Sequence, residues 1–152
     1  SLYQIGHLYL FVDLLIQSSA NHKEITVGKL KDFYIREAVS FIEQNYSHTI
    51  TVEDIAAFCN LNRSYLGKIF RDSLNQTPQQ FLIYYRMNRA AELLKFSEMP
   101  INEISRMVGY PNQLHFSRAF RNVFGISPSS WRKENKFSKV LNREQKNSDK
   151  KE

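Results

Sequence analysis

Apolar residues recur at helical spacing along most of the chain. Within 32–46, for example, Ile35, Val39 and Ile42 are three or four positions apart, which places them on one face of a helix. Capping residues, prolines and glycines mark where further helices begin and end. We expect a polar connector at 18–29, a mobile tail at 138–152, and helices at 2–17, 32–46, 51–58, 62–74, 78–96, 100–108, 112–124 and from 127 onward.

The chain repeats itself at a shift of 50 residues. Residues 62–71 align with residues 112–121, and the identical pairs are Asn62/Asn112, Phe70/Phe120, Arg71/Arg121 and Pro78/Pro128. Upstream, Ile55 pairs with Ile104 at a shift of 49, so the two turns differ in length by one residue. Each copy therefore has the outline of a helix-turn-helix unit, with a short helix, a tight turn and a second helix.

The second helix of each copy is amphipathic. One side is an apolar stripe, formed by Leu66, Ile69, Phe70 and Leu74 in the first copy and by Phe116, Ala119, Phe120 and Phe124 in the second. The opposite side carries no acid, and its residues are Ser64, Gly67, Lys68 and Arg71 in the first copy and Leu114, Ser117, Arg118 and Arg121 in the second. A solvated face would normally mix both signs of charge, and small side chains let a helix enter a groove about 12 Å wide. These two faces are therefore expected to meet DNA.

The distribution of charge supports a nucleic-acid partner. The net charge is +6, and residues 60–136 carry 12 basic and 5 acidic side chains, whereas residues 1–59 carry 4 and 7. Such a concentration of positive charge is expected of a surface that faces a polyanion. With only 5 Gly and 4 Pro, the composition favours an all-α fold over a turn-rich β domain. The single cysteine, Cys59, excludes an internal disulfide and fits a reducing cytoplasm.

The helix expected at 78–96 suits a rigid spacer between the two copies. Its 19 residues span roughly 28 Å at 1.5 Å per residue, and one turn of duplex DNA rises about 34 Å. A helix of this length can hold two recognition helices near successive major grooves on one face of the DNA. A single chain would then do what most helix-turn-helix proteins do as dimers.

Two groups of motifs carry a resemblance to a known family. The first is Gly109-Tyr110, His115-Phe-Ser-Arg-Ala-Phe120, Gly125-Ile-Ser-Pro128 and Trp131-Arg132, and the second is Pro78-x-x-Phe81-x-x-x-Tyr85-Arg86 followed by Ala90-x-x-Leu93-Leu94. Through them, residues 32–136 resemble the DNA-binding domain of the AraC/XylS family of bacterial transcription regulators. The resemblance implies an all-α fold of about seven helices, in which a long linker helix joins two helix-turn-helix subdomains whose recognition helices are 63–74 and 113–124.

The resemblance also implies roles for residues on the two recognition helices. The expected base readers are Arg63, Ser64, Gly67 and Lys68 in the first helix and Gln113, Leu114, Ser117 and Arg118 in the second. Leu114 suits contact with a thymine methyl group, and Arg118 or Lys68 suits donation to guanine. Phosphate contacts are expected from Arg71 and Arg121 and from the helix starts at Thr77 and Ser127.

Two features set the first copy apart from the family pattern. Its turn, Cys59-Asn60-Leu61, lacks the glycine that relatives often have there, and Gly67 offers no side chain where many relatives read a base. Sequence-specific reading is therefore expected of the second copy more than of the first.

The resemblance divides the chain into three parts. Residues 1–30 are expected to be a remnant of an upstream regulatory and dimerisation domain, residues 31–136 the DNA-binding domain, and residues 137–152 a disordered tail. The apolar segment 8–16 is then either a dimer contact or a piece of the missing domain, and it is too short to span a bilayer, so no membrane partner is expected. The resemblance further implies an activator that recruits RNA polymerase, and a small-molecule effector that binds the upstream domain. It is compatible with a dimeric full-length protein.

Several conspicuous side chains have structural explanations. Most aromatic residues, including Phe70, Phe120 and Trp131, have core spacing, and Cys59 suits a small buried position. Tyr84 and Tyr85 would suit base stacking, but packing on the linker helix is expected of them instead. Ion pairs, either within the helix or between the subdomains, are expected for Arg86 and Arg89. For His115, a DNA contact, a packing role and simple exposure to solvent remain open.

Catalysis finds no support in the chain. Its histidines show no metal-ligand spacing with one another or with Cys59, and no glycine-rich phosphate loop is present. The adjacent Glu53 and Asp54 are explained by the dipole of the helix that they begin. We expect no enzyme activity, no metal and no cofactor. Two other functions stay open: a helical protein-interaction module, which would tolerate acids on the exposed faces, and an RNA-binding regulator, which would present exposed aromatic platforms.

Overall fold

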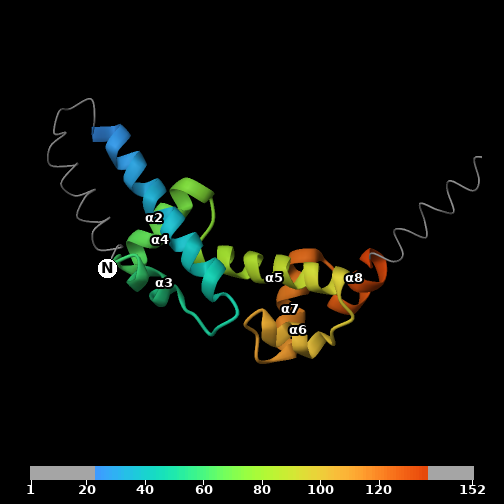
Figure 1. Cartoon of the computed structure of the whole chain (residues 1–152). Coiled ribbons are helices and arrows are strands. Elements are labelled where there is room, and N and C mark those ends of the chain that lie inside the picture. Colours follow the sequence, from blue (N-terminus) through green and yellow to red (C-terminus); the bar gives the residue numbers. More distant parts are fainter. Residues whose placement is uncertain (1–22, 137–152) are drawn as a thin grey trace, which may run out of the picture. The chain divides into compact units, whose positions relative to one another are not determined.

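Residues 23–136 of the chain are described by a computed structural model. Within this range every regular element is a helix, and the helices are α2 (Lys23–Asn45), α3 (Val52–Phe58), α4 (Arg63–Leu74), α5 (Pro78–Phe96), α6 (Ile101–Met107), α7 (Gln113–Phe124) and α8 (Pro128–Asn135) (Figure 1). The expectation of an all-α fold is confirmed. The helix predicted at 2–17 and the tail predicted at 137–152 lie outside the described residues.

The helices form two compact units, each with its own helix-turn-helix. Among the described residues, the first unit consists of 23–41 and 53–77 and contains α3 and α4. The second consists of 42–52 and 78–136 and contains α5, α6, α7 and α8. The boundary falls inside α2, whose last residues therefore belong to the second unit.

The core of the first unit is formed by the apolar stripe predicted for α4. Leu66, Ile69 and Phe70 are fully buried, whereas Leu74 is partly buried near the helix end. Ile55 and three further residues of the same unit, in α2, α3 and the following turn, are also buried, namely Ala38, Ala56 and Cys59. The expectation of a buried cysteine is confirmed. Burying a side chain of the size of leucine or phenylalanine contributes about 1.5–3 kcal/mol, so this stripe is enough to orient α4.

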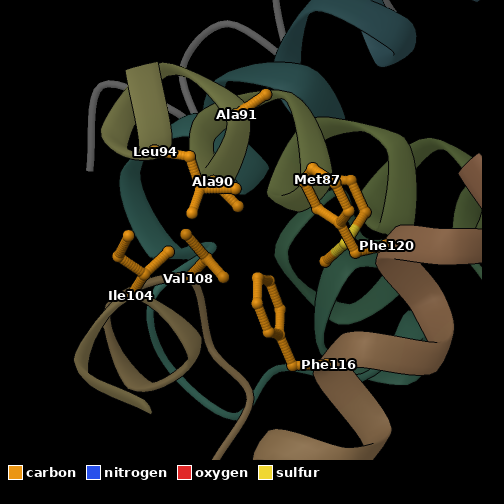
Figure 2. Packing of buried hydrophobic residues seen from close by; sticks show 8 residues of the cluster. All are labelled: Met87, Ala90, Ala91, Leu94, Ile104, Val108, Phe116 and Phe120. Carbon is orange, nitrogen blue, oxygen red and sulfur yellow. The ribbon is translucent and has the colours of Figure 1, made fainter. Parts of the chain in front are cut away.

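The second unit has a core of the same design around α5. Met87, Ala90, Ala91 and Leu94 of α5 gather with Ile104, Val108, Phe116 and Phe120 (Figure 2). The indole ring of Trp131 in α8 closes this core through ring contacts with Phe120 and Phe124, at centroid distances of 6.1 and 5.8 Å. The second predicted stripe is thus also the buried one, and it fixes which face α7 turns outward.

The first described helix, α2, begins nine residues before the predicted start at residue 32. The polar connector predicted at 18–29 is therefore wrong from Lys23 onward. Residues 27–29 are exposed, so this part of the helix carries no periodic apolar signal. A helix that is nucleated elsewhere can extend through such residues, because each added residue gains one hydrogen bond for one fixed backbone conformation.

Candidate nucleic-acid interface

The repeat found in the sequence holds element by element in the structure. Helices α3 and α6 both have seven residues and differ by 49 positions, whereas α4 and α7 both have twelve residues and differ by 50. The predicted difference of one residue thus falls in the turns, where the stretch between α6 and α7 is one residue longer. The two recognition helices are consequently equivalent position by position.

The same kind of residue begins both recognition helices. The side-chain oxygen Oδ1 of Asn62 accepts from the amide of Tyr65 at 2.7 Å, and that of Asn112 accepts from the amides of Leu114 and His115 at 2.9 and 3.2 Å. An asparagine at this position satisfies backbone donors that have no partner inside the helix. These caps set the first residue of each predicted DNA-facing surface.

Left-handed residues end both recognition helices and form both turns. Asn75 and Gly125 end α4 and α7 at φ values of 53° and 82°, each donating its amide to the carbonyl of an arginine four residues earlier. In the turns, Asn60 of the first unit has φ 53° where Gly109 of the second has φ 88°. The first turn therefore keeps its shape without glycine, because asparagine tolerates the left-handed region better than most residues.

Arg86 is buried, with 8% of its surface exposed, and it binds the segment that follows α2. Its Nε and Nη2 atoms donate to the carbonyl oxygens of Tyr46 and His48 at 2.9 and 2.8 Å, and its guanidinium lies 5.6 Å from the ring centre of Tyr110. Burial lowers the pKa of Arg86. The ion pair expected for Arg86 is thus wrong: carbonyl oxygens take the place of a carboxylate.

Of the predictions for other side chains of α5, some are confirmed and one is wrong. Arg89 forms an ion pair with Glu92 at 2.8 Å within α5, which is the intrahelical one of the two expected arrangements. The ring of Tyr85 packs edge-on against that of Tyr46 at 5.2 Å, whereas Tyr84 is largely exposed and does not take the expected packing role. None of these residues lies on a recognition helix.

The predicted DNA-facing residues of α4 lie on its exposed side. Arg63, Ser64, Lys68 and Arg71 are exposed, and a Cβ atom built on the partly exposed Gly67 would meet no atom within 4 Å. Among the residues that the structure describes, Lys68 and Arg71 have no ion-pair partner. They remain available to an anionic ligand.

The first base reader, Arg63, is already engaged with a residue of α3. Its Nη1 forms an ion pair with Oε1 of Glu53, and a second pair joins Asp72 of α4 to Lys31 of α2 at 3.1 Å. Sequence reasoning placed Glu53 at a helix start and missed both pairs. The signal was weak because the partners stand 10 and 41 residues apart, which no helical period relates.

The predicted DNA-facing residues of α7 also lie together on its outer side. Gln113, Arg118 and Arg121 are exposed, Ser117 is partly exposed, and Leu114 is 70% exposed. At this exposure, Leu114 contributes little to packing among the described residues. Neither arginine forms an ion pair with another described residue.

Two of the residues proposed to contact phosphate lie outside the recognition helices, and they are less exposed to solvent than Arg71 and Arg121. Ser127 caps α8, accepting the amide of Ser130 at 3.2 Å and donating to the hydroxyl of the same residue at 2.9 Å. Thr77 is partly buried just before α5. In residues 23–136 no group of three or more His, Cys, Asp or Glu side chains could hold a metal ion, and no helix could cross a bilayer.

Two helix-turn-helix units, each with a capped recognition helix whose predicted DNA-facing residues include cations and no acid, define a DNA-binding domain of the bipartite class. A family model described as "Helix-turn-helix domain" matches residues 55–134. The chain belongs to the AraC/XylS family of transcription regulators, as the curated relatives and solved structures that it matches also indicate.

Among the relatives, the Msm operon regulatory protein of Streptococcus mutans serotype c is 40% identical over 134 residues, which cover 88% of this chain and 48% of that protein. The lactose operon transcription activator of Staphylococcus xylosus is 45% identical over 98 residues, covering 64% of this chain and 35% of that protein. The chain thus spans about half the length of these curated relatives, or less.

Solved structures give the same result. The C-terminal domain of AraT, a response regulator from Geobacillus stearothermophilus, has a TM-score of 0.66 and 35% identity, covering 68% of this chain and 87% of that one. The DNA-binding domain of AdpA, solved in complex with a target DNA, has a TM-score of 0.62 and 25% identity, covering 66% and 90%.

Proposed function

We propose that this domain binds double-stranded DNA sequence-specifically, with α4 and α7 inserted into successive major grooves. The observation that carries the proposal is the exposed cations Lys68, Arg71, Arg118 and Arg121, which occupy equivalent positions on two helices that each begin at an asparagine cap. The 19 residues of α5 supply a spacer of roughly 28 Å at 1.5 Å per residue. That length is close to the rise of about 34 Å for one turn of duplex.

Within each groove, some of these side chains contact bases and others contact phosphates. Arg118 and Lys68 donate to guanine, Leu114 contacts a thymine methyl group, and Ser64, Ser117 and Gln113 approach the neighbouring base edges. Arg71 and Arg121 lie closer to the ends of their helices and neutralise phosphate. Gly67 offers no side chain at the centre of α4. We therefore expect α7 to contact more bases than α4 does.

For the whole protein, we propose a transcription activator of the bacterial cytoplasm that recruits RNA polymerase and has no enzyme activity. An upstream domain binds a small-molecule effector. The names of relatives support this reading, since they include a lactose operon transcription activator and regulatory proteins of the raffinose and melibiose operons. These names favour a sugar-utilisation operon as the target.

Selection of bound duplexes from a random library at near-physiological salt tests the binding mode. Two enriched boxes about one helical turn apart support insertion of both helices. One enriched box would mean that α7 reads sequence and α4 grips the backbone. If no sequence is enriched and no duplex is bound in a salt-dependent way, the domain is a protein-interaction module instead.

Replacing Arg118 by alanine should weaken binding to the selected duplex by about 1–3 kcal/mol and relax the base preference of one box. Lys68→Ala should cost less if the first unit contacts mainly the backbone. Titrations of both variants against the selected duplex and single-base variants of it measure these effects. Unchanged affinity of Arg118→Ala, or equal relaxation of both boxes by the two variants, would contradict these roles.

A further inference from the structure

The two helix-turn-helix units differ in the charge beside their recognition helices. Where the first unit has Glu53 and Asp72, the second has Asn102 and Asn122 at the aligned positions. Glu53 and Asn102 are the second residues of α3 and α6, and Asp72 and Asn122 are the tenth residues of α4 and α7. The repeat thus provides an internal comparison, with two carboxylates in one copy and two neutral amides in the other.

Each of these two carboxylates of the first unit forms an ion pair with a cation. Glu53 pairs with Arg63, the first residue of α4, and Asp72 pairs with Lys31 of α2. The residue of α7 that corresponds to Arg63 is the neutral Gln113. The charged pair of Glu53 and Arg63 in the first unit therefore corresponds to two amides in the second.

The pair of Glu53 and Arg63 contributes little to holding the fold together. Their side chains are 58% and 66% exposed, and an ion pair in water gains little because the solvent screens both charges. The acids at the next position, Asp54 and Glu103, are present in both units and cancel in the comparison. What distinguishes the first unit is the electrostatic potential at its DNA-facing surface.

We propose that Glu53 and Asp72 lower the affinity of the first unit for DNA, and that Glu53 acts mainly by holding Arg63. This inference rests on the proposed function of α4. A carboxylate beside a recognition helix repels the phosphates of the duplex. A guanidinium that is already paired releases no net counterion on binding until it exchanges its carboxylate for a phosphate.

The second unit has no such restraint, because Arg118 and Arg121 stand on a helix with neutral residues at both positions. Glu53 and Asp72 therefore make the two units unequal in affinity, independently of the side chain that Gly67 lacks. They are affinity-determining residues that need not touch a base.

The test compares Glu53→Gln and Asp72→Asn with the wild type on the selected duplex, from about 50 to about 300 mM salt. For Glu53→Gln, affinity at physiological salt should rise about threefold to tenfold, and the slope of log K against log salt should steepen by up to about 0.9. Asp72→Asn should give a smaller gain, because its partner lies on α2. Thermal unfolding of each variant confirms that the fold is kept.

The second unit supplies matched controls. Asn102→Gln and Asn122→Gln exchange one neutral amide for another and should leave affinity unchanged, whereas Asn102→Glu should lower it and flatten the salt slope. Combining Glu53→Gln with Arg63→Gln tests whether Glu53 acts through Arg63. The gain in DNA affinity from removing the carboxylate should be smaller when the arginine is absent. A gain of full size in that background would overturn the role given to Arg63.

Two results distinguish failure of this inference from failure of the proposed function. If the wild type binds duplex DNA but Glu53→Gln binds equally or more weakly, the inference is wrong. Weaker binding with relaxed base preference would show that Glu53 instead orients Arg63 for base reading. If the wild type itself binds no duplex at any salt concentration, the proposed function is wrong.

Discussion

Two glycines of the domain differ in what a side chain would do at their positions. Gly109 has φ 88°, and a Cβ atom there would lie 2.4 Å from the carbonyl oxygen of Tyr46 and 2.9 Å from the Arg86 guanidinium. Gly67 lies inside α4, and a Cβ atom there would meet nothing within 4 Å. Glycine is therefore required by packing at the first position and only tolerated at the second.

Replacing each glycine by alanine should change stability in opposite directions. Gly109→Ala should destabilise the domain by about 2–4 kcal/mol, through left-handed strain and overpacking. Gly67→Ala should stabilise it by about 0.5–1 kcal/mol, because alanine favours the helix interior. Chemical unfolding of both variants measures the difference. A destabilised Gly67→Ala protein would mean that α4 is crowded at its outer face.

At the scale of the element, local signals explain how much of the fold could be predicted. The bounds of α4 and α7 agree with the predicted ones because capping and left-handed residues stand at their ends, and α5 begins at the predicted Pro78. The start of α2 could not be predicted, since residues 27–29 near it are exposed and give no periodic apolar signal. Periodicity also indicates which side of α4 faces outward, but not that Glu53 reaches Arg63 or that Arg86 reaches the segment after α2.

The two asparagine caps should each contribute measurably to stability. Asn62→Ala and Asn112→Ala should each destabilise the domain by about 1 kcal/mol, with the larger effect at Asn112, which accepts from two amides. The matched control is Asn122→Ala on the exposed side of α7, which should not destabilise. Thermal unfolding of the three variants makes the comparison. Equal losses at all three positions would mean that the caps have no special role.

At the scale of the whole molecule, the charge of the chain is concentrated where the structure places the recognition helices. Residues 60–136 hold most of the excess positive charge, and four exposed cations of α4 and α7 have no ion-pair partner among the described residues. Each cation that neutralises a phosphate releases a counterion, so affinity must depend on salt.

The number of available cations predicts the size of that dependence. With Lys68, Arg71, Arg118 and Arg121 on phosphate or in the groove, log K should fall against log salt with a slope of about −3 to −4. Affinity should then drop about 100-fold between 50 and 200 mM salt. Fluorescence anisotropy with the selected duplex measures the slope. A slope near zero would contradict electrostatic binding, and a slope near half the expected value would mean that only one unit engages.

The carbonyl partners of Arg86 have a consequence for acid conditions. An arginine held by a carboxylate loses its partner's charge when acid protonates that carboxylate, as happens to surface ion pairs. The oxygens of Tyr46 and His48 that accept from Arg86 are main-chain carbonyl oxygens, which take up no proton at physiological pH. The contact between Arg86 and the segment that follows α2 should therefore persist as the pH falls through the range in which surface ion pairs are lost.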